Sequence, residues 1–490
     1  MEETNDLIKQ RKEKLNALRE EGINPYPYFF KKTHSTLQIS EENKDLEKET
    51  RTKKHVAVAG RIMTLRIMGK ASFAHIQDDS GQIQFYIRED DVGKEIYKIF
   101  KKVDLGDIVG IKGTIFKTKM GELSVYAEEF EILAKSLRPL PEKFHGLKDI
   151  EIKYRQRYLD LISNKEVKDT FVKRTEIIKS LREFLDNKGF LEVETPVLQR
   201  VYGGANARPF KSFLHDLKMD VYMRVSDELY LKRLVTGGFE KVYEIGKDFR
   251  NESVDRTHNP EFTQMECYWT YVDYNDMMNL VEEMIESIAK KVLGTTKIEY
   301  QGHKINLKAP WKRITVKDAI KKYANINVDE YNNEEMKELL RSYNIEYEGD
   351  YSRGLAITLL FEELVEDKLV DPVFVIDYPK EASPLCKIHR KHDDLIEKFE
   401  PYIAGMELGN GYTELNDPEI QKELLEEQAK ELRAGSEDAH PMDEDFVKSV
   451  EFGMPPMGGF GLGVDRLIMI LTDSVSIRDV ILFPFMKEIE

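Results

Sequence analysis

Polar and aromatic side chains alternate along the stretch from Phe249 to Thr270, in two runs that flank a polar segment. The second run repeats at every other position, with Phe262, Gln264, Glu266 and Tyr268. An extended chain places such residues on one face of a strand. Ordinary sheet packing explains one such alternation about as well. Two alternations around a polar loop favour a pair of antiparallel strands whose polar faces line one cleft.

Residues 55–137 show a different texture, with five short β segments separated by turns that carry Gly or Asp. A helix-like piece, residues 93–100, lies between the third and fourth segments. This order predicts an oligonucleotide-binding (OB) barrel, a fold whose strand face stacks bases on aromatic side chains. Phe73 lies on that face in the prediction, although a core position for Phe73 explains the same pattern.

The remaining segments predict an α+β chain in which a β-barrel precedes a larger domain that contains an antiparallel sheet flanked by helices. Residues 1–54 read as a solvated helix and a polar connector, and the Pro-rich start of residues 138–162 reads as a linker. Residues 163–490 then form the larger domain, and residues 295–355 resemble a small insertion within it.

The composition limits the classes of protein to which this chain can belong but does not indicate an activity. The 490 residues are 41% apolar and 33% charged, which describes a globular protein with a well-solvated surface. The absence of an apolar run of about 18 residues predicts no contact with a membrane. Two cysteines exclude a disulfide framework, so we expect a cytoplasmic protein. A net charge of −16 argues against a protein that coats nucleic acid, and DNA is not an expected partner.

Three further segments collect groups that a hydrophobic core does not need. Asn410, Tyr412 and Glu414 share a strand face by their spacing. Glu400 and Glu407, seven residues apart, suit a hard divalent cation such as Mg2+.

Glycine marks the other two places of interest. Gly459, Gly461 and Gly463 lie where the backbone must approach a ligand closely, just before Arg466 in the first turn of a helix. Residues 203–204 are a second glycine pair upstream.

Several familiar catalytic signatures are missing from the sequence. No GxxxxGK[ST] phosphate loop and no HExxH pair occurs, and residues 459–463 lack the βαβ continuation of a dinucleotide fingerprint. No Ser-His-Asp arrangement is suggested. What remains suits substitution at a phosphorus centre, in which the enzyme positions reactants and neutralises charge with Arg and Mg2+.

These residues resemble the class II aminoacyl-tRNA synthetases and, within them, the lysyl-tRNA synthetases. Residues 189–198 resemble motif 1, residues 249–262 motif 2 and residues 461–466 motif 3. The lysine assignment rests on GGANARPF, ELYLKRL, HNPEFTQMECY, ELGNGYTELND and the terminal IRDVILFP, with RIMGKASF and GELS in the barrel. The resemblance covers essentially the whole chain.

The resemblance implies a lysine–tRNA ligase that activates L-lysine with ATP and then charges tRNA(Lys). It implies a six- or seven-stranded antiparallel sheet, a homodimer formed through motif 1 and an anticodon-binding barrel. It also implies about two to three Mg2+ ions, held by Glu400 and Glu407.

The same resemblance implies roles for individual residues. The catalytic residues are Arg250 and Arg466. The expected ATP-binding residues are Arg250, Glu252, His258, Asn259, Phe262, Glu407, Gly463 and Arg466. The expected lysine-binding residues are Gly204, Glu228, Arg250, Glu266, Tyr268, Asn410, Tyr412 and Glu414. The expected anticodon-binding residues are Arg66, Phe73, Gln84 and Glu122.

The expected amino-acid pocket has a chemical preference. The α-amino group is expected at Gly204 and Glu228, and the side-chain end of the substrate near two carboxylates and two phenols, Glu266, Glu414, Tyr268 and Tyr412. Such a set suits a long side chain with an ammonium tip. An aspartyl- or asparaginyl-tRNA synthetase shares the architecture but needs a cation or an amide there. A non-catalytic RNA-binding paralogue and a lysine ligase that acts on a protein are further alternatives.

The chain departs from the family pattern at three places. Ser253 replaces the usual Gly after FRNE, and Thr257 stands where many bacterial members have Arg before the loop His. Ser226 and Asp227 replace the usual Ala-Pro before Glu228. These changes leave the expected contact residues in place, and they leave open the geometry of the loop 253–257.

Overall fold

The computed structural model describes residues 2–141, 149–347, 351–433 and 441–488. The chain divides into two compact units, residues 1–148 and residues 149–490. Of the predicted linker, residues 142–148 lie outside the described residues, and residues from 149 onwards form helices of the second unit. We describe each unit by itself, and the predicted domain boundaries stay a prediction.

The first unit is the predicted five-stranded barrel. Its strands close in the order β1-β2-β3-β5-β4 around a core that contains Phe85, Phe100 and Phe130. The strand bounds are β1 Arg51–Met68, β2 Ala71–Gln77, β3 Gln82–Arg88, β4 Ile108–Lys117 and β5 Leu123–Ala134. Helices α1 Glu2–Glu20 and α2 Thr36–Glu42 precede the barrel, and α3 Glu89–Val92 and α4 Lys94–Phe100 follow β3. A helix after the third strand is what the segment order predicts.

The second unit is built on a ten-stranded sheet in the described part of the chain. Eight strands follow the path β14-β15-β17-β19-β20-β11-β10-β6, and the short strands β16 and β18 pair with β17 off this path. The strand bounds are β6 Leu191–Glu192, β10 Lys241–Phe249, β11 Glu261–Thr270, β14 Lys312–Thr315, β15 Val373–Pro379, β16 Ile388–His389, β17 His392–Ile403, β18 Met406–Glu407, β19 Gly409–Thr413 and β20 Met457–Gly463. The sheet is antiparallel except where β14 joins β15 and β6 joins β10. The sheet has ten strands, more than the six or seven that the family resemblance implies. The short strands β14 and β6 extend its edges, and two further short strands pair with β17.

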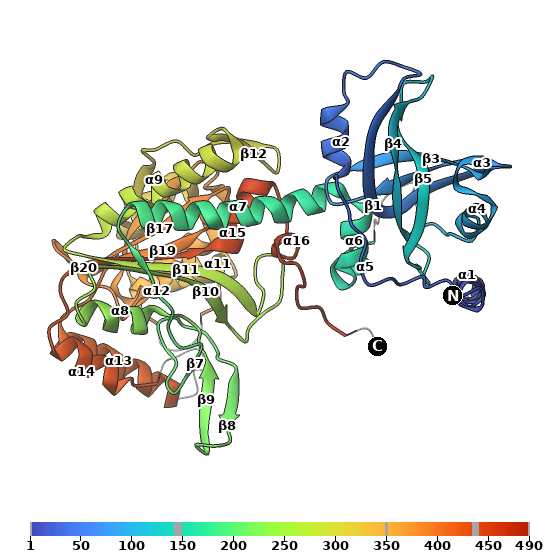
Figure 1. Ribbon diagram of the computed structural model, residues 1–490. Helices are drawn as coiled ribbons and strands as arrows, with labels where there is room; N and C mark the ends of the chain where they lie inside the picture. The colour runs from blue at the N-terminus through green and yellow to red at the C-terminus, as the bar shows by residue number, and fades with distance from the viewer. Residues whose placement is uncertain (1, 142–148, 348–350, 434–440, 489–490) are drawn as a thin grey trace. The chain divides into compact units, whose positions relative to one another are not determined.

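Helices cover both faces of this sheet (Figure 1). One face packs against α7, α9 and α15, with Ile177, Met277 and Leu467 in a continuous apolar core. A separate cluster packs α8 and α14 against the other face. The helix bounds are α5 Ile150–Arg155, α6 Arg157–Ser163, α7 Lys165–Asn187, α8 Glu228–Thr236, α9 Tyr274–Leu293, α10 Val316–Ala324, α11 Asn333–Ser342, α12 Arg353–Leu364, α13 Pro418–Arg433, α14 Glu444–Glu451, α15 Val464–Thr472 and α16 Ile477–Val480.

Two small sheets complete the second unit. Strands β7 Leu198–Gln199, β8 Lys211–Leu214 and β9 Met219–Met223 pair in the order β7-β9-β8, and β12 Lys297–Tyr300 pairs with β13 His303–Asn306. The predicted insertion near residues 295–355 thus contains a hairpin, the edge strand β14 and two helices, with residues 348–350 outside the description. Among the described residues, no helix is long and apolar enough to span a membrane.

Candidate active site

The alternation in residues 262–268 places its side chains over one face of the sheet, as predicted. Buried Met265 and Cys267 point to the apolar core, while Gln264, Glu266 and Tyr268 line a cavity on the other face. The antiparallel partner β10 pairs with β11 from Lys241 to Phe249, so the predicted pair of antiparallel strands is confirmed, whereas the first run of the alternation, at Arg250 and Glu252, follows the end of β10 and is not part of a strand. Period-two side-chain direction thus separates packing residues from site residues within one strand.

Three neighbouring strands build the base of the site. Glu266, Gly461 and Asn410 lie opposite one another across β11, β20 and β19. Tyr268, Gly459 and Tyr412 form the next row in the same register. The middle strand therefore contributes glycines, and the two outer strands contribute functional side chains.

The glycines of β20 leave the space that the cavity occupies. A Cβ atom on Gly459 would lie 2.1 Å from Glu414 Oε1 and 2.5 Å from Tyr268 Cε1. A Cβ atom on Gly461 would lie 3.1 Å from Gln264 Nε2. The close backbone approach that the sequence predicted at these positions is therefore an approach to side chains of the two flanking strands.

The first cavity, of about 190 Å³, contains all the predicted lysine-binding residues. These are Gly204, Glu228, Arg250, Glu266, Tyr268, Asn410, Tyr412 and Glu414. Gly204 adopts a φ of +91°, and a Cβ atom there would lie 2.8 Å from Ser226 Oγ, so the position requires glycine in both conformation and space.

Two carboxylates of this cavity share an internal cation. Lys232, which is fully buried in α8, places its Nζ 2.5 Å from Glu228 Oε1 and 2.5 Å from Glu414 Oε2. Burial raises the pKa of Glu228 to about 7 and that of Glu414 to about 8, although the Lys232 ammonium opposes the shift. Burial and proximity to like charges have this effect on carboxylates. The cavity is thus acidic and readily neutralised by a further cation.

Glu266 lies one row away and is held by three donors. It accepts hydrogen bonds from Ser226 Oγ at 2.7 Å, Gln264 Nε2 at 2.7 Å and Tyr268 Oη at 2.8 Å. Burial and the charge of Asp248 raise the pKa of Glu266, whereas this set of donors opposes the rise and fixes the carboxylate in one orientation.

The second cavity, of about 230 Å³, contains all the predicted ATP-binding residues. These are Arg250, Glu252, His258, Asn259, Phe262, Glu407, Gly463 and Arg466. The Arg250 guanidinium lies 5.1 Å from the Phe262 ring centroid. Arg466, in the first turn of α15, contacts Glu407 Oε2 at 3.2 Å and His258 Nε2 at 3.2 Å. A flat apolar ring and two guanidinium groups therefore line one cavity.

The divergent loop of residues 253–257 is held by hydrogen bonds to one carboxylate, that of Asp255. Asp255 accepts hydrogen bonds from the backbone N–H groups of Thr257 and His258 at 2.7 and 2.8 Å. Against the effect of partial burial, these bonds and the His258 ring lower the pKa of Asp255 to about 2. The loop is exposed to solvent except at Thr257, so local bonds fix its shape.

The two cavities are continuous along the sheet. Arg250, Gln264, Asn410 and Gly461 line both of them. These four residues therefore lie where the cavities meet, and a group bound there lies beside the Arg250 guanidinium.

The predicted metal-binding carboxylates differ in their surroundings. Glu407 lines the second cavity, whereas Glu400 is buried in β17, where Tyr378 and Tyr402 donate to it and Lys398 Nζ lies 2.9 Å away. Burial and the charge of Glu400 raise the pKa of Glu407. Burial and the charges of Glu400 and Glu407 also raise the pKa of Glu366 to about 8, although Tyr402 donates a hydrogen bond to Glu366. This concentration of negative charge fits a divalent cation, with Glu407 as the carboxylate that reaches the cavity.

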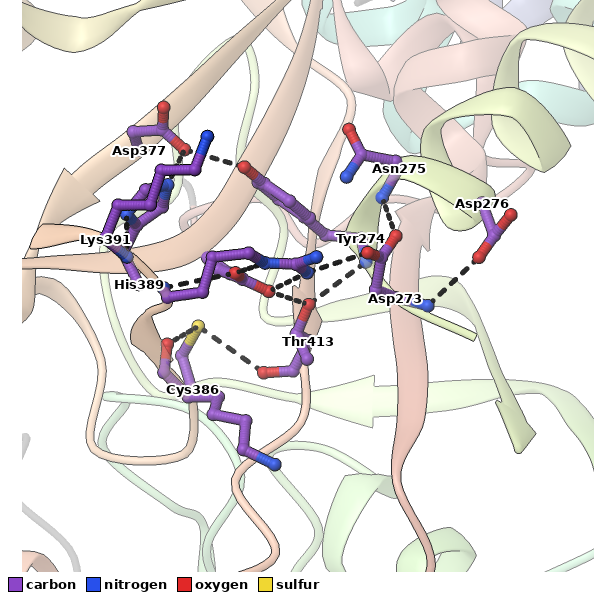
Figure 2. Close-up of polar contacts among 12 residues, drawn as sticks. Asp273, Tyr274, Asn275, Asp276, Asp377, Cys386, His389, Lys391 and Thr413 are labelled. Atoms are coloured by element: carbon purple, nitrogen blue, oxygen red, sulfur yellow. Dashed lines mark hydrogen bonds and ion pairs between the residues drawn. The ribbon is translucent and has the colours of Figure 1, made fainter. Parts of the chain in front are cut away.

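A network of ion pairs and hydrogen bonds supports β19 at Thr413 (Figure 2), whose side chain points to the face opposite that of Tyr412 because side chains alternate along a strand. Thr413 Oγ1 donates to Glu397 Oε2 at 2.6 Å and accepts from the backbone N–H of Tyr274 at 3.1 Å. Arg390 pairs with Glu397 and, at 2.7 Å, with Asp273 at the start of α9. The strand that carries two of the lysine-pocket residues is therefore held by side chains from β17, α9 and the turn between β16 and β17.

The predicted anticodon-binding residues lie together on the barrel. Arg66 is opposite Phe73 in the register of β1 and β2. Gln84 Nε2 donates to Glu122 Oε2 at 2.7 Å, and His75 contacts the other oxygen of Glu122 at 2.6 Å. The alternative core position for Phe73 is wrong, because this ring is half-exposed and faces Tyr86 at 4.7 Å between centroids.

Some residues of the first cavity were not predicted from the sequence. Ser226 and residues 383–385 line it, and Lys232 lies beneath it. Lys232 carries a usable signal, because a Lys four residues after Glu228 in a helix places both groups on one face. Residues 383–385 carry no such signal, since their position depends on the path of a loop between β15 and β16.

Comparisons with known proteins give a consistent result. Residues 149–487 match the family model of class II tRNA synthetases (D, K and N), and residues 56–133 match that of the OB-fold nucleic acid binding domain. The chain is 53% identical to the lysine–tRNA ligase of Clostridium novyi (strain NT), covering 99% of this chain and 95% of that protein. It is 52% identical to the lysine–tRNA ligases of Pelotomaculum thermopropionicum and Carboxydothermus hydrogenoformans, covering 99% of this chain and 96% and 99% of those proteins.

Proposed function

Because this chain belongs to the class II tRNA synthetases of the D, K and N group, we propose that it is a lysine–tRNA ligase that works through the two joined cavities. The observation that carries the proposal is the continuity of an acidic cavity with an arginine-lined one, through Arg250 and Asn410. The first suits an amino acid that carries two ammonium groups, and the second suits a nucleoside triphosphate.

The reaction has two steps. An oxygen of the lysine carboxylate attacks the α-phosphorus of ATP in line, the bond to the bridging oxygen breaks, and pyrophosphate leaves. A hydroxyl of the terminal ribose of tRNA then attacks the acyl carbon, and AMP leaves. Arg250 lies where both cavities meet, so its guanidinium stabilises the negative charge that develops at phosphorus in the first step.

The rows of the sheet suggest how lysine lies in its cavity. Glu266 is in the row of Asn410 and Gly461, which line both cavities, so we place the α-ammonium group there, with Gly204 and Glu228 beside it. The sequence prediction instead placed Glu266 near the side-chain end of lysine, so the two assignments of Glu266 differ. Glu414 follows β19, and its Oε1 atom reaches into the next row, 2.1 Å from the position of a Cβ atom on Gly459, where it contacts the ε-ammonium group in this proposal. A step of two residues along a strand is about 7 Å, close to the length of an extended lysine side chain.

The second cavity accommodates ATP with the adenine between Phe262 and Arg466. Stacking on an aromatic ring and a guanidinium plane is favourable for any base. Glu252 is assigned to the adenine edge, His258 to the β- and γ-phosphates, and Asn259 and Gly463 to the walls of the same cavity. The exposed loop that carries Glu252 and His258 closes over the nucleotide in this proposal.

Mg2+ bound with ATP supplies positive charge to the phosphates. Glu407 holds it at the cavity, and Glu400 stands behind Glu407 as the neighbouring carboxylate. We propose about two to three ions, in keeping with the sequence prediction, because the triphosphate and the carboxylates together carry more charge than one divalent ion neutralises.

The barrel binds the anticodon of tRNA in this proposal. Phe73 stacks on the central base, and Gln84 and Glu122 contact its edge, with Arg66 next to Phe73. We further propose a homodimer formed through residues 189–198, where Leu191 and Leu198 are about half-exposed, and a cytoplasmic location.

An aspartyl- or asparaginyl-tRNA synthetase is the alternative within the same architecture. Its shorter substrate carries no ammonium group on the side chain, which leaves Glu414 without the cation that we assign to it.

Pyrophosphate exchange tests the function directly. We expect exchange with ATP that depends on lysine and exceeds that with aspartate or asparagine by at least about 10⁴-fold, because an unpaired buried carboxylate is costly. A Phe73→Ala variant should retain this exchange and lose tRNA charging. Exchange that is faster with aspartate or asparagine than with lysine would contradict the assignment.

A further inference from the structure

The place where this chain departs from the family pattern before Glu228 lies directly behind the lysine cavity. Asp227 precedes α8 and has only 2% of its surface exposed. Its Oδ1 atom is buried and has no hydrogen-bond partner in the described part of the chain. A buried carboxylate in such a place is costly if it is charged, so its protonation state needs an explanation.

Asp227 belongs to a cluster of three buried carboxyl groups. One oxygen from each of Asp227, Asp248 and Glu266 lies within 4.8 Å of the others. Arg224 Nε is 3.0 Å from Asp248 Oδ1, and the same guanidinium also pairs with Glu244. Arg224 is therefore the ion-pair partner of both Asp248 and Glu244, whereas Asp227 and Glu266 have no cationic ion-pair partner among the residues that the structure describes.

The three carboxyl groups have unequal partners. Glu266 accepts from Ser226, Gln264 and Tyr268, whereas Asp227 makes a side-chain hydrogen bond to Glu266 itself. A hydrogen bond between two carboxyl groups requires that one of them carries the proton. Glu266 already has three donors, so the proton belongs on Asp227. Burial raises the pKa of Asp227 well above its usual value, and the charges of neighbouring carboxylates add to the shift.

We propose that Asp227 is a neutral acid that keeps its proton and donates a hydrogen bond to Glu266, and so holds Glu266 ionised and oriented for the α-ammonium group of lysine. Asp227 is a positioning residue, since it is absent from the residues that line the cavity. The proposal rests on the proposed function, because it takes lysine as the occupant. Two changes at adjacent positions, Ser226 and Asp227, give Glu266 two of its donors in this chain.

The protonation state of Asp227 depends on its charged neighbours. Glu266 on β11 and Asp248 and Glu244 on β10 favour the neutral acid, and Arg224 opposes it. Glu228 in α8 is paired with Lys232, and Arg250 acts on Asp248. A divalent cation bound by the three carboxyl groups is the competing explanation. The Arg224 guanidinium already occupies the side of Asp248, which disfavours such an ion.

Infrared difference spectra of the full-length protein test the protonation state without any substrate. We expect the wild type minus Asp227→Asn spectrum, at about pH 8, to show the carbonyl band of one protonated carboxyl group. The spectrum of wild type minus Glu419→Gln, an exposed control, should lack this band. A missing band, or a stoichiometric divalent ion that the wild type binds and Asp227→Asn does not, would overturn the proposal.

Kinetics test the positioning. Since Asn is an uncharged mimic of the neutral acid that can donate to Glu266, Asp227→Asn should keep the KM for lysine within about threefold of wild type at pH 7. Asp227→Ala should raise that KM about tenfold or more with a smaller change in kcat. At alkaline pH the wild-type KM should rise more steeply than that of Asp227→Asn, since position 227 can ionise in the wild type and not in the variant.

The outcomes separate this proposal from the proposed function. If the wild type charges tRNA with lysine and Asp227→Asn is as defective as Asp227→Ala, the donor role of Asp227 fails and the function stands. If the wild type does not use lysine, the function fails, while the infrared band still reports the state of Asp227.

Discussion

The two halves of the cleft differ in how much of their structure is complete before a substrate binds. In the lysine cavity the charged groups are buried and already bonded, with Lys232 between Glu228 and Glu414 and three donors on Glu266. In the nucleotide cavity, Glu252 and His258 lie on an exposed loop, and Arg466 is in contact with His258 at 3.2 Å.

The difference reflects what each half must recognise. A buried carboxylate discriminates strongly, because a substrate that lacks the ammonium group leaves it unpaired. The nucleotide half needs to enclose a large, highly charged molecule and release it, which an exposed loop allows. Selectivity therefore resides in the half whose charged groups are buried and already bonded, and closure in the half that carries the exposed loop.

Arg250→Ala is expected to have the largest effect, because this residue belongs to both halves. We expect the rate of lysine-dependent pyrophosphate exchange to fall by about 10³-fold or more, since the guanidinium stabilises charge in the transition state. Exchange assays at saturating lysine and ATP measure it. Arg341→Ala, on the exposed surface of α11, is the matched control. A defect limited to the KM of one substrate would contradict the shared position.

Glu414→Gln should impair the lysine half alone. The change leaves the buried ε-ammonium group with an uncharged partner, and we expect kcat/KM for lysine to fall by about 10²- to 10³-fold. The KM for ATP should stay within about twofold. Glu419→Gln, exposed on α13, controls for loss of one charge. An equal loss for both substrates would show that the two halves are not separable.

Phe262→Ala should impair the nucleotide half alone. Loss of a base-stacking ring costs about 1–3 kcal/mol, so the KM for ATP should rise about 10- to 100-fold. The affinity for lysine, measured by calorimetry without ATP, should be unchanged. Weaker binding of lysine in this variant would indicate that Phe262 supports both cavities.

The pH dependence of lysine binding should be the smallest of these effects. Like Glu414→Gln, a change of pH should alter the lysine half alone. Burial raises the pKa of Glu228 to about 7 and of Glu414 to about 8, so both carboxyl groups become protonated as the pH falls. Lysine binds the ionised forms, and its affinity should therefore begin to fall below about pH 8, by up to about tenfold between pH 8 and pH 7, where Glu414 protonates first. Calorimetric titration from pH 6 to 8.5 measures this. A rise in affinity on acidification would show that the sign is wrong.

Much of this site follows from side-chain spacing. Period two in residues 262–268 and 410–414 predicted which side chains share a face, and the structure places them in two adjoining cavities. The glycines of β20 were recognised as a close approach, although not to Glu414 and Tyr268. The comparisons confirm the family, the fold class and the lysine–tRNA ligase function that the resemblance implied.

Other features depend on contacts between distant segments, which no local pattern carries. Nothing near Glu400 in the sequence indicates that Tyr378 donates to it or that Lys398 offsets its charge. The number of strands was underestimated because β6, β14, β16 and β18 are only two to four residues long. Such segments lack the length at which alternation becomes recognisable.

The four residues common to both cavities bear on inhibitor design. Arg250, Gln264, Asn410 and Gly461 line both spaces, so the two cavities adjoin. A compound that links a lysine-like amine to an adenosine-like ring would therefore pass over Gly461, beside the Gln264 amide, whose Nε2 atom lies 3.1 Å from the position of a Cβ atom on Gly461. Tethering two weak fragments raises the effective concentration of each into the millimolar range. The backbone of Gly461 and the Gln264 amide thus lie on the two sides of the route that the tether must take.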